Sequence, residues 1–312
     1  MMKALYDVPA PAKLNLFLHV VGKRPDGYHL LQSLFVLIDW ADTLHFDRRD
    51  DGQLLRHDLG PKLPDDDLCL RAARLLKQHS GCAYGADIHI DKRLPAGAGM
   101  GGGSSDAASV LITLNRLWDL RLPRKTLLDL GLQLGADVPF FIGGHNAIVE
   151  GIGEVLHPVD LPPLQFAVLK PPASIATKEI FSSPLLARSE SVAIVAGFPA
   201  HTNFRESIDK TFSKTFGKND LRNDLQKAAE AACPEVALAT QMLDKTFGGT
   251  SSISRMTGSG SAVFALIESV GGEGGVLSQA MATILRDAPE GWLGEICRSL
   301  NRHPLVGWVE DS

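Results

Sequence analysis

The sequence predicts an α+β protein with two lobes. Three observations lead to this class: strands in which polar and apolar residues alternate, a glycine-rich loop that opens a helix, and a proline-rich stretch near residue 160. Alternation is typical of antiparallel strands with one solvated face. A length of 312 residues favours two domains, because a domain ordinarily holds about 100–200 residues. We therefore expect one domain over residues 1–160 and a second over 161–312.

The first predicted strand covers residues 12–21. Its leucines at 14, 16 and 18 alternate with other residues, so they share one face. Lys13 and Asn15 lie two apart on the other face. This pattern has two interpretations: an ordinary solvated strand face, or a cation and an amide directed into a cleft.

Further elements follow from periodicity and from residues that begin or end helices. In the first half we expect an apolar strand over 34–38 after an Asp-Gly turn at 26–27, a helix over 68–77 capped by the aspartates at 65–67, and an alternating strand over 86–94. Two helices follow, one through 107–118 and one over 125–134 that ends at glycine 135. In the second half we expect a strand over 166–169, a helix over 224–245 broken at proline 234, and a glycine loop at 256–260 that leads into a strand over 262–267. The polar residues 200–220 are expected to form an exposed excursion.

The composition excludes several classes of protein. Thirty-one basic and 36 acidic residues leave a net charge of −5, which argues against a nucleic-acid partner bound through bulk positive charge. Residues 1–11 do not resemble a signal peptide, and the chain contains no apolar run of about 18 residues that would span a membrane. The four cysteines are scattered without a C-x-x-C pair, so we expect reduced thiols and a cytoplasmic location.

Five glycines between Gly97 and Gly103 precede a helix. Glycines allow the backbone to approach an anion closely, and the helix N-terminus adds N–H groups and a positive partial charge. The sequence therefore predicts a phosphate site, to which the hydroxyls of Ser104 and Ser105 can contribute by binding phosphate or magnesium. A flexible surface turn is the simpler alternative, but Pro95 and the patterned helix speak against it.

Two other kinds of phosphate-binding loop fit less well. No G-x-x-x-x-G-K-[ST] pattern is present, so this is not a Walker A loop. Gly97, Gly99 and Gly102 match the dinucleotide pattern G-x-G-x-x-G, with Asp119 near the distance expected for the ribose-binding acid. That fold requires a continuous apolar strand before the loop, whereas the strand here alternates with charged residues.

Two further motifs have both structural and chemical interpretations. Asp137 follows a predicted helix end, where it is either a cap or turn residue or a carboxylate that accepts a proton in phosphoryl transfer near Lys13. Tyr28 and His29 follow the Asp26-Gly27 turn. They either cover the edge of the core or stack a base and read its edge.

Together, these motifs identify the chain as resembling the GHMP kinases, and within them the members that act on 4-diphosphocytidyl-2-C-methyl-D-erythritol. The resemblance covers residues 10–153 and 171–181 well and is patchy in the rest of the second half. It implies an N-terminal lobe like the second domain of ribosomal protein S5, a ferredoxin-like C-terminal lobe, and an active site in the cleft between them. Five segments carry it: Pro-Ala-Lys-Leu-Asn-Leu-Phe-Leu (11–18), Arg-Pro-Asp-Gly-Tyr-His (24–29), the glycine loop (94–108), Leu-Gly-Ala-Asp-Val-Pro (134–139) and Thr-Gly-Ser-Gly (257–260).

The resemblance implies that ATP donates its γ-phosphoryl group to the 2-hydroxyl of this cytidyl compound, in the non-mevalonate pathway of isoprenoid biosynthesis. Mg²⁺ is expected with ATP, although we assign no metal ligands. The implied catalytic residues are Lys13 and Asp137. The implied ATP-binding residues are Pro95, Ala96, Gly97, Ala98, Gly99, Met100, Gly101, Gly102, Gly103, Ser104, Ser105, Lys92 and Asp67, and the implied substrate-binding residues are Asn15, Tyr28, His29, Thr177 and Phe181.

In this scheme Asp137 accepts or orients the hydroxyl proton. Lys13 keeps that carboxylate ionised and stabilises the developing alkoxide, while Asn15 binds substrate hydroxyls. Tyr28 and Phe181 sandwich the cytosine. We expect a monomer or a weak homodimer.

The chain departs from the family pattern at Asp67 and Asp106, where asparagine is common. An ionised carboxylate only accepts hydrogen bonds, whereas an amide also donates them, so the adenine contact of Asp67 is the weaker expectation. Lys92 is the candidate to compensate the charge of Asp106. Two alternatives remain. The first is a GHMP kinase that acts on another small alcohol, and the presence of both Tyr28 and Phe181 speaks against it. The second is a non-catalytic nucleotide-binding protein, and the presence of both Lys13 and Asp137 speaks against it.

Overall fold

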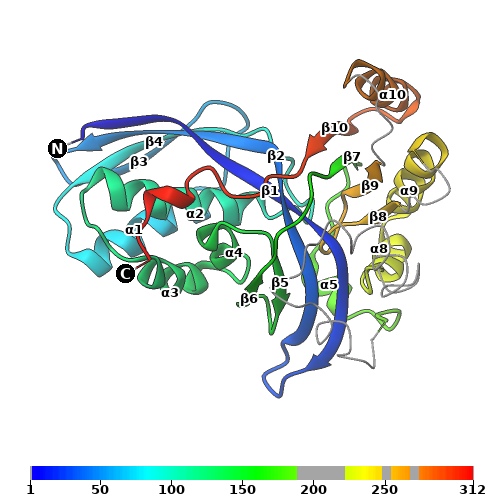
Figure 1. Cartoon of the computed structure of the whole chain (residues 1–312), viewed down its shortest axis with the longest axis horizontal. Coiled ribbons are helices and arrows are strands. Elements are labelled where there is room, and N and C mark those ends of the chain that lie inside the picture. The colour runs from blue at the N-terminus through cyan, green and yellow to red at the C-terminus, as the bar shows by residue number, and fades with distance from the viewer. Residues whose placement is uncertain (1, 188–221, 248–253, 268–273, 312) are drawn as a thin grey trace.

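The structure is a computed structural model and describes residues 2–187, 222–247, 254–267 and 274–311. The polar excursion expected over 200–220 lies outside these ranges. The described elements form two sheets, each covered by helices on one face (Figure 1). No helix in the described ranges is long and apolar enough to cross a membrane.

The first sheet has the order β3-β4-β2-β5-β6, with β1 paired to β2. Its neighbours are antiparallel except β3 and β4, which run parallel. Helices α1 and α2 contact the sheet, α3 and α4 pack against these helices, and apolar residues of all four belong to one core with the strands. The strands are β1 (Ala4–Lys23), β2 (His29–Arg49), β3 (Leu54–Asp58), β4 (Gly85–Asp91), β5 (Ala147–Glu150) and β6 (Val155–Pro158), and the helices are α1 (Leu68–Ser80), α2 (Gly102–Leu117), α3 (Arg124–Leu134) and α4 (Val138–Gly143).

The second sheet is antiparallel, with the order β10-β7-β9-β8. Helices α8, α9 and α10 lie over it and bury a second core (Figure 1). Its strands are β7 (Gln165–Lys170), β8 (Ser254–Met256), β9 (Val263–Ile267) and β10 (Leu293–Arg298), and the helices of this half are α5 (Thr177–Phe181), α8 (Gln226–Ala232), α9 (Pro234–Phe247) and α10 (Gly274–Asp287). The short 3₁₀ helix η3 (Val306–Trp308) lies back against α2 in the first half.

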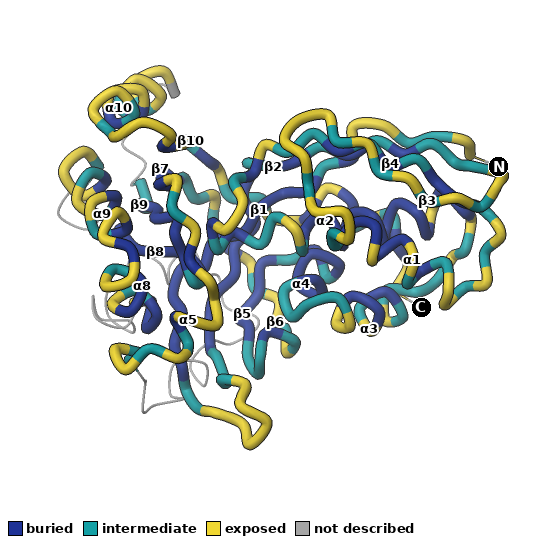
Figure 2. Tube along the Cα trace, turned by 180° about the vertical axis from the view of Figure 1, so that it is seen from behind, coloured by how far each residue is buried: buried dark blue, intermediate teal, exposed yellow. Residues whose placement is uncertain are grey.

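Strand β1 connects the two halves. Leu18 and Val20, near its end, belong to the core under the second sheet. Between the sheets, Leu14 and Phe17 lie in a third cluster that also contains Phe166 of β7. Figure 2 shows buried residues along β1 where the sheets meet. Strand β1, which carries Lys13 and Asn15, therefore contributes residues to the cores of both halves and to the cluster between them.

Most predicted elements are present, usually longer than expected. Helix α1 begins after Asp67, whose carboxylate accepts a hydrogen bond from the backbone N–H of Leu70 as an N-cap. Pro234 begins a new helix, as its fixed φ and missing N–H require. In β4, Ile88 and Ile90 are buried while the intervening residues are half-buried, which confirms the alternation. The division at residue 160 stays a prediction.

Two expectations differ from the structure. The purely antiparallel pattern expected around residues 86–94 is wrong on one side, because β4 pairs in parallel with β3, a strand that the sequence pattern did not reveal. The solvated-face interpretation of Lys13 and Asn15 is also wrong, because both side chains are buried. Strand β1 has helix α2 on one side and the second lobe on the other, and neither contact is visible in local sequence.

Candidate active site

The glycine loop adopts a conformation that requires its glycines. Gly97, Gly99 and Gly101 have φ of 60°, 72° and 73°, in the left-handed region that other residues rarely adopt. Gly101 occupies the N-cap position of α2, and no side chain of the described residues caps this helix. The N–H groups in the first turn of α2 therefore have no capping side chain. Free N–H groups at a helix N-terminus are the arrangement that binds anions.

The second glycine loop, residues 257–260, packs directly on the first. A Cβ on Gly99 would lie 2.3 Å from the carbonyl oxygen of Thr257. Backbone hydrogen bonds link the two segments, from Ser261 N–H to the Gly97 carbonyl at 3.1 Å and from Ala262 N–H to the Ala98 carbonyl at 3.2 Å. The phosphate loop of the first lobe is thus held by backbone contacts from the second.

Lys13 lies beneath the phosphate loop. Its N–H donates to the Met100 carbonyl at 3.0 Å, and its Nζ donates to Asn15 Oδ1 at 2.5 Å and lies 4.5 Å from the ring centre of Phe35. The Asp137 carboxylate is 3.7 Å from Nζ. Burial lowers the pKa of Lys13, and the nearby charge of Asp137 opposes this effect. The structure therefore brings the two expected catalytic residues together.

Asp137 stands at the N-cap position of α4, but its side chain makes no capping hydrogen bond. Its carboxylate is 33% exposed, whereas Lys13 is 3% exposed. The cap interpretation of Asp137 therefore holds for its position and not for its side chain. A partly exposed carboxylate thus lies beside a buried ammonium.

Asn15 is fixed by a buried network. Its Oδ1 accepts from Lys13 and, at 3.1 Å, from the hydroxyl of Thr257, while its Nδ2 donates to Ser33 Oγ at 2.9 Å. The backbone N–H of Asn15 donates to Thr257 Oγ1 at 2.9 Å. Sequence reasoning identified the Thr-Gly-Ser-Gly motif but assigned no role to Thr257 or Ser33. Thr257 could have been found from its place in that motif. Ser33 belongs to no motif that would have identified it.

Lys92 directly follows β4, and its ammonium lies near the start of α2 between two carboxylates. Its Nζ donates to Asp106 Oδ2 at 2.7 Å and also to Asp42. Burial lowers the pKa of Lys92, but the two carboxylates outweigh it and the net shift is upward. The expectation that Lys92 compensates the charge of Asp106 matches this geometry, although Asp42 competes for the same ammonium.

Asp106 is 2% exposed, and its Oδ1 has no hydrogen-bond partner within the described ranges. Burial raises the pKa of Asp106 to about 7, with Lys92 opposing the rise and Asp42 adding to it. Asp42 Oδ1 already accepts two backbone N–H groups, from Arg93 and Leu94. Asp42 thus accepts hydrogen bonds from three groups, the third being the Lys92 ammonium.

Two expected ATP-binding residues are engaged elsewhere in this arrangement. The Ser105 hydroxyl is buried and donates to the Pro11 carbonyl at 2.7 Å, so Ser104 is the serine whose side chain is partly exposed. The Asp67 carboxylate caps α1 and pairs with Arg56 at 2.9 Å. Both positions were chosen from motifs, which do not show the partners that folding supplies.

The residues expected to hold a cytidine gather at the turn between β1 and β2 and at α5. The ring of His29 stacks on Phe181, with centroids 4.9 Å apart and an interplanar angle of 20°. Tyr28 is 61% exposed, and Thr177 Oγ1 lies 2.8 Å from Ser259 Oγ. His29 thus covers one face of Phe181, and Phe181 also packs against the core of the second half. The stacking of a base between Tyr28 and Phe181 stays a prediction.

Within the described ranges, no group of three or more His, Cys, Asp and Glu residues is arranged to hold a metal ion. All four cysteines are free thiols. Magnesium bound to ATP takes most of its ligands from phosphates and water and needs only one or two protein oxygens. The partly exposed oxygens beside the loop belong to Ser104 and Asp137.

Known proteins resemble this chain along its whole length. A model of the GHMP kinases N terminal domain matches residues 67–145. Curated proteins named 4-diphosphocytidyl-2-C-methyl-D-erythritol kinase are 57% identical over 308 residues in Methylibium petroleiphilum, covering 99% of both chains, and 53% identical in Variovorax paradoxus, covering 99% of this chain and 100% of the relative.

Solved structures agree with these sequence relatives. A crystal structure of 4-(cytidine 5'-diphospho)-2C-methyl-D-erythritol kinase has a TM-score of 0.70 and 32% identity, covering 93% of this chain and 98% of its own. The homoserine kinase of Cytophaga hutchinsonii has a TM-score of 0.67 and covers 97% of this chain and 96% of its own. At 16% identity, it shows the shared fold.

Proposed function

Because this chain belongs to the 4-diphosphocytidyl-2-C-methyl-D-erythritol kinases, within the GHMP kinases, we propose that it transfers the γ-phosphoryl group of ATP to the 2-hydroxyl of that compound. The single observation that carries the chemistry is the Lys13–Asp137 pair, 3.7 Å apart beside an uncapped helix N-terminus. The reaction belongs to the non-mevalonate route to isoprenoid precursors.

The phosphates of ATP bind along the glycine loop and the first turn of α2. Backbone N–H groups at a helix N-terminus donate to phosphate oxygens, and the helix dipole adds favourable charge. Gly97, Gly99 and Gly101 tolerate the left-handed φ of the loop, and because they have no side chains the nucleotide can approach the backbone closely. Positioning and charge stabilisation of this kind supply most of the rate enhancement in phosphoryl transfer.

Asp137 takes the proton of the attacking hydroxyl. The hydroxyl oxygen forms a bond to the γ-phosphorus, the bond from that phosphorus to the β–γ bridging oxygen breaks, and ADP leaves. Lys13 keeps Asp137 ionised and stabilises negative charge on the attacking oxygen. Asn15 binds the substrate through an amide that Ser33 and Thr257 hold in one orientation.

The donor is the complex of ATP with Mg²⁺, which binds as one substrate. When bound, magnesium would neutralise charge on the phosphates, and Ser104, whose side chain is partly exposed in the first turn of α2, would supply a protein oxygen to it. Lys92 lies at the same end of α2, close to Gly102. We further propose that the enzyme acts in the cytoplasm on small molecules, which accords with its four free thiols.

The cytidine end of the acceptor binds between the β1–β2 turn and α5. The exposed ring of Tyr28 and the half-buried ring of Phe181 supply stacking surfaces, while His29 and Thr177 lie beside them to read the base and ribose. This placement accounts for a kinase that recognises a nucleotide part remote from the reacting hydroxyl.

The test is ADP release from ATP and Mg²⁺, with the cytidyl compound compared against mevalonate, homoserine and galactose. Turnover with the cytidyl compound alone supports the proposal. Turnover with another alcohol would keep the kinase chemistry and discard the cytidine pocket. A protein that binds ATP and turns over none of the four would overturn the proposal in favour of a nucleotide-binding role.

A further inference from the structure

The C-terminal strap, residues 299–311, leaves the second sheet after β10 and returns to the first lobe, where the chain ends near α3 (Figure 1). Its Leu300 N–H donates to the Leu37 carbonyl of β2 at 2.8 Å. Leu305 and Val309 are buried in the core of the first lobe. The strap is therefore a packed part of the lobe that holds the phosphate loop.

The strap contacts the C-terminal end of α4. The N–H of His303 donates to the carbonyl of Gly144, which caps this helix, at 2.9 Å. A Cβ on Gly144 would lie 2.8 Å from a Val306 methyl group, so the contact is close. Asn146 Nδ2 donates to the Leu300 carbonyl at 3.0 Å. The opposite end of the same six-residue helix begins at Asp137.

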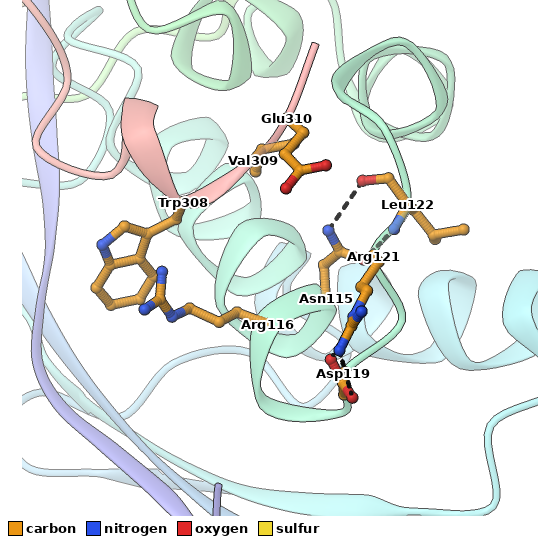
Figure 3. Close-up of a pocket in the computed structure, with 8 residues that line it drawn as sticks. All are labelled: Asn115, Arg116, Asp119, Arg121, Leu122, Trp308, Val309 and Glu310. Carbon is orange, nitrogen blue, oxygen red and sulfur yellow. Dashed lines mark hydrogen bonds and ion pairs between the residues drawn. The ribbon is translucent and has the colours of Figure 1, made fainter. Parts of the chain in front are cut away.

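The strap also packs on the C-terminal end of α2. The Arg116 guanidinium lies 4.8 Å from the centre of the Trp308 ring, and Figure 3 shows the two stacked at the edge of a small pocket of about 110 Å³. Asn115 in the same pocket binds both backbone groups of Leu122, which leads into α3. One segment thus contacts the far ends of the two helices whose N-termini form the phosphate site and carry Asp137.

Arg124 joins these contacts. Its Nη1 donates to the Ile142 carbonyl of α4 at 2.9 Å, and its Nη2 donates to the strap carbonyls of Val306 and Val309 at 2.8 and 2.9 Å. Its Nε pairs with Asp311 at 2.5 Å, and the guanidinium is 13% exposed. An arginine has a rigid planar set of donors, so it fixes the strap and the last turn of α4 relative to each other.

We propose that Arg124 is a positioning residue for phosphoryl transfer: by locking the strap to α4, it sets where the Asp137 carboxylate stands. Helix α4 is short and continuous, so a shift at its Ile142 end moves its Asp137 end with it. A displacement of about 1 Å in a reacting group can cost about a hundredfold in rate. The inference rests on the proposed role of Asp137.

The experiment is a double-mutant cycle between Arg124→Gln and Asp137→Asn. Arg124→Gln should lower kcat about tenfold or more while the KM for ATP changes less than twofold, because the phosphate loop keeps its own contacts. In the Asp137→Asn background, Arg124→Gln should lower kcat less than twofold, because the group that it positions is already lost. Arg124→Lys keeps the charge but not the fork of donors, and it should show a smaller loss of the same kind.

Arg121→Gln is the matched control, because Arg121 is exposed near the same end of α2 and pairs with the neighbouring Asp119. It should leave kcat unchanged. If Arg124→Gln does not fold, the same cycle is run with Arg124→Lys. Losses that multiply in the double variant, or an unchanged kcat in the folded single variants, would overturn the positioning role. A fully active Asp137→Asn single variant would instead overturn the proposed base, and this inference with it.

Discussion

The ammonium of Lys13 and the carboxylate of Asp137 meet at 3.7 Å, although one is buried in β1 and the other stands partly exposed before α4. The pair is asymmetric, with a desolvated cation behind an open carboxylate. An exposed ion pair of this length would contribute little to stability. The pair lies close to the start of α2, which has no side-chain cap, and this location supports its proposed role in proton transfer.

Replacing Asp137 with asparagine should lower kcat by about 10²–10⁴, as for other general bases, with little change in KM. Asparagine keeps the size of the side chain and removes the proton acceptor. Steady-state ADP release measures both constants. Asp129→Asn, an exposed aspartate on α3, is the control and should be fully active. Wild-type turnover in Asp137→Asn would contradict the base assignment.

Replacing Tyr28 with alanine should weaken binding of the cytidyl substrate by about 1–3 kcal/mol, the usual loss for one stacking ring. Affinity for ATP should stay unchanged, because the phosphate loop is built from other segments. Titration calorimetry with each ligand separates the two effects. Tyr6, equally exposed at 60% on β1, supplies the control variant Tyr6→Ala. Equal substrate affinity in both variants would remove Tyr28 from the pocket.

Replacing Gly99 with alanine should raise the KM for ATP about tenfold or more. The new Cβ would meet the Thr257 carbonyl at 2.3 Å, so the two glycine loops must separate, and the left-handed φ adds strain of about 1–3 kcal/mol. Gly81→Ala is the matched control, because Gly81 has φ of 65° and open space around it. It should lose stability by strain alone and keep its kinetic constants, and a similar KM in both variants would show that the loop contact is dispensable.

Replacing Asp106 with asparagine should stabilise the protein by about 1–3 kcal/mol at pH 8, where burial disfavours the charged carboxylate. The pKa of Asp106 is raised from 3.8 to about 7. Between pH 3.8 and about 7, the Asp106 carboxyl is therefore protonated in the native state and ionised in the unfolded state. The free energy of unfolding of the wild type consequently falls as pH rises through that interval. The advantage of the variant should grow from pH 4 to 7 and then level off.

Urea unfolding at pH 4.5, 6 and 8 measures this difference in the free energy of unfolding. Asp119→Asn, an exposed aspartate at the other end of α2, controls for the loss of one charge. An advantage that is constant across the three pH values would mean that Asp106 stays ionised throughout. Lys92 would then hold both carboxylates in their charged forms.

Much of the fold follows from local patterns. The spacing of apolar residues and the aspartates before residue 68 located α1 and its cap, and Pro234 located the start of α9. These succeeded because helix capping and proline geometry act over a few residues. Strand β3 was missed because its pairing with β4 is parallel and depends on a distant segment.

Residue type and order along the chain were enough to predict a site made of the glycine loop, Lys13, Asp137 and the aromatic residues near residue 28. The surroundings of these residues depend on the tertiary structure. Packing of β1 between α2 and the second lobe buried Lys13 and Asn15, brought Thr257 onto Asn15, and committed the Ser105 hydroxyl to a backbone carbonyl. The contacts of the C-terminal strap with α2 and α4 also come from tertiary structure alone. Burial and hydrogen-bond partners come from segments far apart in the chain, so no local motif contains them.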